Sequence, residues 1–201
     1  MKYTQIGRTM IEMLGVLAII GVLSVGGLDM ITKSRRNNQI AIILSDVSNV
    51  ASILLQQRKY SPEVKESYNG NFILFLYKIG KIPAEITYNS TSKNLQSELN
   101  STISAEIDTN DIVTIKISSL DKETCLKIAS NNWGSRTDNR FVGLIVGANA
   151  DFSCVNNAEN PCNAGTNSAF AGKDGYPMSV AKAVAACSSQ DSNIVNLAYK
   201  F

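Results

Sequence analysis

The chain has 201 residues, a length that suits one domain with an additional segment, and 19 basic against 17 acidic side chains give a formal net charge of +2. Such a small charge predicts no strongly basic surface for nucleic acid and no field that would attract acidic substrates. Histidine is absent, which excludes the Ser-His-Asp and Cys-His catalytic arrangements and every zinc site that uses histidine. We therefore expect no enzyme activity, no cofactor and no metal site.

The first 28 residues combine a short polar leader, a single acid and a long apolar run. The leader, residues 1–7, ends at Gly7, Glu12 follows five residues later, and residues 13–28 carry no charge. A carboxylate inside a membrane segment costs roughly 2–3 kcal/mol, so Glu12 is a candidate functional residue. A Sec signal peptide would have a shorter apolar core and a small-residue cleavage site. A simple signal anchor is the stronger alternative, because about 20 residues suffice to span a bilayer.

Helical character continues beyond the apolar run. Apolar residues recur at helical spacing from Ile40 to Leu54, while polar residues such as Ser45 and Asn49 fill the other side. No proline precedes Pro62, so the pattern predicts one helix over residues 9–60, which would be about 78 Å long. Its first half is apolar on all sides and should contact lipid or other helices. Its second half is amphipathic and should lie on a globular domain.

The sequence pattern changes at Ser61, where a globular domain over residues 61–201 is predicted to begin. Ser61-Pro62 and residues 68–71 are predicted to break regular structure. The elements predicted after them are, in chain order, a helix at 72–79, strands at 95–108 and 111–120, a helix at 121–130, a strand at 141–146, a polar loop at 154–175, a helix at 180–186 and a strand at 194–201. Because helices and strands are segregated along the chain, we expect an α+β domain with an antiparallel sheet.

Gly7, Glu12 and the apolar residues 13–28 together resemble the class III signal of type IV prepilins, in which these three features stand in the same register. In that family a membrane peptidase cuts after the glycine, the new N-terminus is often methylated, and the glutamate at the fifth mature position guides assembly. The resemblance implies cleavage after Gly7, a new and potentially methylated N-terminus at Arg8, and an assembly role for Glu12.

The resemblance also implies an architecture, a function and partners. The leader 1–7 would precede an N-terminal helix 8–60, whose part 8–28 spans the membrane, and a disulfide-bonded head 61–201 in the pilin fold, closest to type IVb pilins. The subunit would be made as an inner-membrane precursor, cut by the prepilin peptidase, and polymerised with copies of itself by the inner-membrane pilus assembly machinery. The product would be an extracellular pilus, or fimbrium, for adhesion, aggregation or motility, with no nucleic acid as its primary partner.

Four cysteines lie in the C-terminal part of the chain: Cys125, Cys154, Cys162 and Cys187. None forms a Cys-x-x-Cys pair, and an even number outside the cytoplasm predicts two disulfides, with three connectivities open. We favour Cys154–Cys162, because the short loop between them contains asparagine and proline residues that suit tight turning. Cys125–Cys187 would then match the C-terminal disulfide that pilin-like proteins typically carry.

Two other functions are open at this point. One is a pseudopilin of a type II secretion system, which would drive export without forming a long surface fibre. The other is a membrane-tethered extracytoplasmic binding domain or enzyme. The acid pairs Glu98/Glu106 and Asp108/Asp111 could in principle bind calcium or act in acid–base chemistry, but their spacing matches no EF-hand loop. A solvated strand edge is the expected role of these acids.

Overall fold

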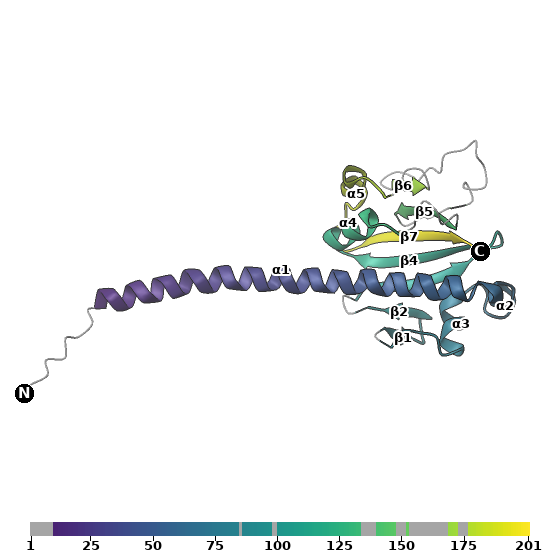
Figure 1. The fold of residues 1–201 in the computed structure, drawn as a ribbon, viewed down its shortest axis with the longest axis horizontal. Helices are drawn as coiled ribbons and strands as arrows, with labels where there is room; N and C mark the ends of the chain where they lie inside the picture. The colour runs from purple at the N-terminus through teal and green to yellow at the C-terminus, as the bar shows by residue number, and fades with distance from the viewer. Residues whose placement is uncertain are drawn as a thin grey trace, which may run out of the picture. The chain divides into compact units, whose positions relative to one another are not determined.

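The computed structural model describes residues 10–84, 86–97, 100–133, 140–147, 152, 169–172 and 177–201 (Figure 1). The chain divides into two compact units, Met1–Gln39 and Ile40–Phe201. The long helix α1, Met10–Gln56, crosses this boundary, so its first part belongs to the first unit and its last part to the second. The expected order of a long N-terminal helix followed by an α+β domain is confirmed.

The end of the long helix differs from the prediction. Helix α1 ends at Gln56, and a short 3₁₀ helix, Arg58–Tyr60, leads into α2, Ser61–Ser67. Ser61-Pro62 therefore begins a helix, and the prediction that it breaks regular structure is wrong. Proline fits this position because the N–H groups of the first helical turn have no partner within the helix.

Helix α3, Phe72–Lys78, confirms the helix predicted for this apolar run. Asn71 Oδ1 accepts a hydrogen bond from Leu74 N–H at 2.8 Å, which caps the N-terminus of the helix. Gly80 follows the C-terminus with a φ of +66°, a left-handed conformation that glycine adopts without strain. Asn71 and Gly80 therefore mark the two ends of this helix.

One antiparallel sheet of seven strands forms the centre of the second unit (Figure 1). The strands are β1 Thr87–Asn89, β2 Asn94–Gln96, β3 Thr102–Ile107, β4 Ile112–Leu120, β5 Phe141–Val146, β6 Ala169–Gly172 and β7 Asn193–Lys200. Their spatial order is β1-β2-β3-β4-β7-β5-β6, so the C-terminal strand β7 lies between β4 and β5. Helix α4, Lys122–Ser130, follows β4, and helix α5, Val180–Ala186, precedes β7. The predicted helices and the strands β4, β5 and β7 are confirmed.

Three details of the sheet differ from the prediction. The single strand predicted at 95–108 is two strands, β2 and β3, joined by a turn in which Ser97 N–H donates to Ser101 O at 3.0 Å. Asn100 in this turn has a φ of +58°, a conformation that asparagine tolerates and that ends the extended run. Strand β1 is missing from the prediction because three residues carry too little pattern, and β6 lies inside the predicted loop 154–175.

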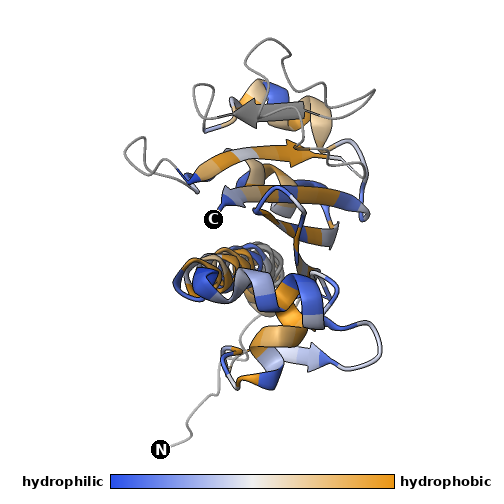
Figure 2. Ribbon diagram, turned by 90° about the vertical axis from the view of Figure 1, so that its right-hand side faces the viewer, coloured by the Kyte–Doolittle hydropathy of each residue, from blue (hydrophilic) through white to orange (hydrophobic). Residues whose placement is uncertain are grey.

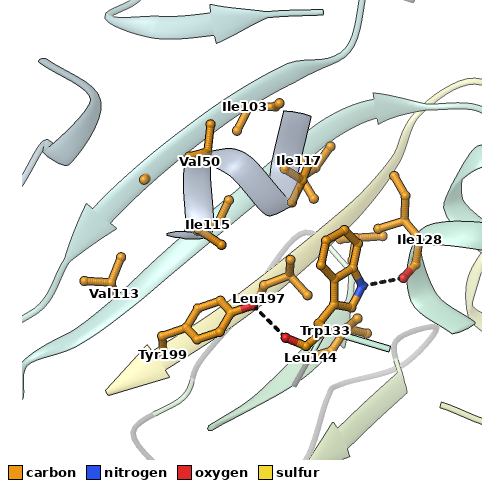
Figure 3. Close-up of a cluster of buried hydrophobic side chains, with 14 of the residues drawn as sticks. Val50, Ile103, Val113, Ile115, Ile117, Ile128, Trp133, Leu144, Leu197 and Tyr199 are labelled. Atoms are coloured by element: carbon orange, nitrogen blue, oxygen red, sulfur yellow. Dashed lines mark hydrogen bonds between the residues drawn. The ribbon is translucent and has the colours of Figure 1, made fainter. Parts of the chain in front are cut away.

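The main hydrophobic core lies between the last part of α1 and one face of the sheet. Alternation along β4 directs Val113, Ile115 and Ile117 to this face. Figure 3 shows Val50 of α1 among Ile103, Ile115 and Ile117. The buried apolar side chains of α1 are Ile40, Ile43, Val47, Val50, Ala51 and Leu54. The second half of the helix is therefore part of the domain core, as its amphipathic pattern predicts.

A smaller apolar cluster lies on the opposite face of the sheet. Its members are Ile112, Val142, Ile145, Phe152 and Ala198. The four that lie in strands, all except Phe152, alternate with residues that point to the main core. In Figure 2 the strands and helices carry the hydrophobic colour, whereas the loops that are coloured are mostly hydrophilic. The sheet thus has apolar contacts on both faces.

Candidate functional site

The strongest functional feature is the contrast between the two apolar stretches of α1. In the second stretch Ile43, Val47 and Val50 are fully buried in the domain core. In the first stretch the described large apolar side chains are between 53% and 64% exposed; they are Met13, Leu14, Val16, Leu17, Ile19 and Ile20. A run of exposed apolar side chains of this kind marks a surface that contacts a membrane or another protein.

Helix α1 is long and apolar enough to cross a membrane. Among the described residues, the segment that is long and apolar enough by length and composition is Met30–Gln56. The large apolar side chains there, such as Ile40, Ile43 and Leu54, are already buried against the sheet, which accounts for their hydropathy without a bilayer. The uncharged residues 13–28 have no such contact at their described side chains, so they are the better candidate for contact with lipid.

The sequence-predicted signal lies mostly beyond what the structure describes. Gly7 and Arg8 fall outside the described residues, and only the backbone of Glu12 is described, within α1. Cleavage after Gly7, methylation of Arg8 and the assembly role of Glu12 therefore stay predictions. The predicted bond between Cys154 and Cys162 also falls outside the described residues.

The disulfide Cys125–Cys187 is present and confirms the second pairing expected from the resemblance. It joins α4 to the end of α5, with the two Cα atoms 5.9 Å apart and both side chains buried. Asp121 caps α4 by accepting a hydrogen bond from Thr124 N–H at 3.0 Å, and Ser179 caps α5 through Lys182 N–H. The bond therefore fixes two short, locally capped helices to each other at one end of the domain.

Removal of this disulfide should destabilise the domain strongly. Replacing Cys125 and Cys187 together with alanine is expected to cost about 2–5 kcal/mol, because the bond closes a loop with a sequence separation of 62. The melting temperature of the full chain in detergent should fall by about 5–15 °C in circular dichroism. The paired replacement of Cys154 and Cys162, whose predicted bond closes a much shorter loop, should lower it less. An equal or smaller shift for the Cys125/Cys187 pair would contradict this assignment.

The predicted acid pair Asp108/Asp111 shapes a hairpin. Asp108 Oδ1 accepts hydrogen bonds from Asn110 N–H at 2.8 Å and Ile112 N–H at 2.9 Å, which is the bonding of an Asx turn. Asp111 has a φ of +61°, and its Oδ1 lies 2.8 Å from Lys65 Nζ in an ion pair. Among the described residues, no group of three or more His, Cys, Asp or Glu side chains could hold a metal ion. These two acids therefore serve the turn between β3 and β4.

The hydrogen bond from Lys65 lowers the pKa of Asp111 below its usual range, with partial desolvation opposing it and Ser61 Oγ adding a second donor at 3.1 Å. Because the folded pKa is below the unfolded one, the pair stabilises the fold above pH 4, roughly the unfolded pKa, and is lost as the pH falls through the folded pKa. Lys65→Gln should cost less than about 1 kcal/mol at pH 7, since both side chains are partly exposed. Urea unfolding at pH 7 and pH 3 should show a smaller difference at the lower pH, and a constant difference would contradict it.

A polar pocket of about 450 Å³ lies on the sheet over β3, β4 and β7. Its polar lining consists of Ser104, Glu106, Asp108, Thr114, Lys116 and Asn196. Ser104, Lys116 and Asn196 form one row across the three strands, and buried Asn196 is held by a hydrogen bond from its Nδ2 to Gly147 O at 2.9 Å. Sequence reasoning missed this grouping because the register between β4 and β7 is not visible in the sequence. Glu98, the predicted partner of Glu106, lies outside the described residues.

Comparison of the chain with models of protein families, with curated proteins and with solved structures finds no match. The function therefore has to be inferred from the chain itself. The two features available for that are the signal-like register of Gly7, Glu12 and residues 13–28, and a helix that is exposed and apolar in its first part but buried in a disulfide-linked domain in its last part.

Proposed function

We propose that this protein is a structural subunit of a type IV pilus. It is made as a prepilin in the inner membrane, cut after Gly7 by the prepilin peptidase, and polymerised through its N-terminal helix into an extracellular fibre. The observation that carries the proposal is the exposure of the apolar side chains from Met13 to Ile20 on the same helix that enters the domain core from Ile40 onward. A helix of this composition can anchor the precursor in lipid and later bury the same side chains against copies of itself.

The layout of the second unit supports the proposal. A pilin head needs a domain that keeps its fold outside the cell, and the disulfide Cys125–Cys187 is typical of such compartments. The last part of α1, from Ile40 onward, packs into the core of this domain, as the second half of a pilin helix would. The antiparallel sheet with a long N-terminal helix is the coarse arrangement expected of the pilin fold.

The proposed mechanism is physical and not catalytic. Cleavage after Gly7 exposes a positively charged α-amino group on Arg8, while the Glu12 carboxylate sits in an apolar bundle where its charge is costly unless paired. The amine of a neighbouring subunit is the natural partner, and this pairing would set the axial register of each new subunit, as buried polar groups do in coiled coils. Burial of the apolar stretch 13–28 between subunits then holds the fibre together.

The proposal is tested by looking for the fibre. Bacteria that produce the protein with pilus assembly machinery are sheared, and the released material is labelled with an antibody raised against residues 177–201 in electron microscopy. Labelled fibres that disappear when the gene is deleted support the proposal. Labelled protein that stays in the membrane, with a secretion defect on deletion, would instead indicate a type II secretion pseudopilin.

A second candidate function is a binding domain tethered to the membrane by α1. The observation that favours it is the polar pocket over β3, β4 and β7, whose lining includes Glu106, Lys116 and Asn196. This function predicts an uncut N-terminus and no fibre. A protein that stays in the membrane and keeps residues 1–7, and whose gene can be deleted without a secretion defect, would therefore favour this function over both a pilus subunit and a pseudopilin.

A further inference from the structure

Three cations follow the apolar stretch of α1 within four residues. Lys33 and Arg35 are exposed and Arg36 is partly exposed, and all three lie in the described part of the first unit. They follow Met30 and Ile31, whose apolar side chains are 77% and 51% exposed. We call Lys33, Arg35 and Arg36 the cationic collar.

The position of the collar along the helix matches the edge of a bilayer. Residues 13–32 precede it, and this stretch contains a single charged residue, Asp29. At 1.5 Å per residue these residues span about 30 Å, which is the thickness of the hydrocarbon core. With the apolar stretch in the core, the collar lies at the level of the headgroups on the side farther from the N-terminus.

The three cations lie at nearly one depth along the helix axis. They occupy less than one turn of axial height. Successive residues of an α-helix are rotated by about 100°, so Arg35 lies about 160° from Lys33, and Arg36 lies between them, about 60° from Lys33. The cations therefore occupy about half of the helix circumference at one depth, where a single layer of headgroups can contact all three.

We propose that the cationic collar binds the phosphate groups of anionic phospholipids in the leaflet farther from the N-terminus. Basic residues at the end of an apolar helix attract anionic headgroups, and their long side chains reach the interface. Asp29 stands four residues before Lys33 and offsets one of the three charges, which leaves a net positive site. The inference rests on the membrane-anchored precursor of the proposed function, but it requires neither cleavage nor filament assembly.

The test compares lipids bound to the full-length precursor. The protein is extracted from membranes, exchanged into detergent with equal amounts of palmitoyl-oleoyl phosphatidylglycerol and phosphatidylcholine, and analysed by native mass spectrometry. The wild type should retain phosphatidylglycerol at least about fivefold over phosphatidylcholine, the factor expected for one cation at an anionic surface. The variant Lys33→Gln/Arg35→Gln/Arg36→Gln should bind both lipids equally.

A matched control removes the same charge from the second unit. Lys78, Lys81 and Lys182 are exposed there, and replacing them with glutamine should leave the preference unchanged. A wild type without preference, a collar variant that keeps it, or a control that loses it would each overturn the proposal. Excess inorganic phosphate should not abolish the preference, and its loss would mean a site for free anions. Recovery of the precursor without detergent would contradict the proposed function itself, whereas a membrane-embedded precursor without preference contradicts only the collar.

Discussion

Replacing Glu12 with alanine is expected to abolish filaments while leaving cleavage after Gly7 intact. The cleavage signal lies at Gly7 and Arg8, so the peptidase should still cut the variant. Assembly should fail, because the α-amino group of a neighbouring subunit would be buried in the bundle without its carboxylate. Removing one partner of a buried ion pair costs about 3–5 kcal/mol, which corresponds to more than a hundredfold in each docking equilibrium.

The measurement has two readouts. Mass spectrometry of the membrane fraction should show the Glu12→Ala chain without residues 1–7, and immunoblots of the sheared surface fraction should show at least a hundredfold less of it than of the wild type. Glu12→Asp is the matched control, because it keeps the charge and should restore part of the filament yield. Abundant filaments made from Glu12→Ala alone would show that the carboxylate has no assembly role.

Replacing Gly70 with alanine is expected to destabilise the domain strongly. Gly70 has a φ of +76°, and a Cβ atom there would lie 2.7 Å from the carbonyl oxygen of Ile107. This close approach exists because Gly70 O accepts a hydrogen bond from Ile107 N–H at 2.9 Å, while Gly70 N–H donates to Val64 O at 3.0 Å. Glycine at this position thus lets the connection between α2 and α3 bond directly to strand β3.

The expected cost of Gly70→Ala in free energy of unfolding is about 2–4 kcal/mol. It combines the cost of a left-handed backbone at alanine with the cost of a steric clash with a backbone atom. Gly80→Ala is the matched control, since Gly80 has a φ of +66° but no atom within 4 Å of an added Cβ. It should cost only about 1 kcal/mol. Thermal unfolding of the full chain in detergent should give shifts of about 5–15 °C and about 2–4 °C, respectively. Equal shifts in melting temperature for the two variants would mean that the contact with Ile107 does not contribute to the cost of Gly70→Ala.

Local signals in the sequence predict much of the fold. Helix α3 is correct because Asn71 and Gly80 mark its two ends, and β4 is correct because its apolar residues alternate. The amphipathic half of α1 is correct because residues from Ile40 to Leu54 repeat at helical spacing. In each case a pattern within about ten residues determines the element.

Features that depend on pairing between distant segments are not predicted. Strand β1 exists because Tyr88 pairs with Leu95, and β6 exists because its backbone pairs with β5; neither has a strong pattern of its own. The polar pocket needs the register of β3, β4 and β7, which sets Lys116 between Ser104 and Asn196. The predicted signal at Gly7, Arg8 and Glu12 is different in kind, because its function would appear only in the presence of a peptidase and neighbouring subunits.

The measurement that tests the central claim most directly is the intact mass of the unreduced protein from its native membrane or from the sheared surface fraction. A type IV pilin should lack residues 1–7, should begin at Arg8 with or without one added methyl group, and should be lighter by the four hydrogens that two disulfides remove. A chain that retains Met1 in cells with an active prepilin peptidase would contradict the account. The register of Gly7 and Glu12 would then be a coincidence, and α1 would be a simple anchor for the domain.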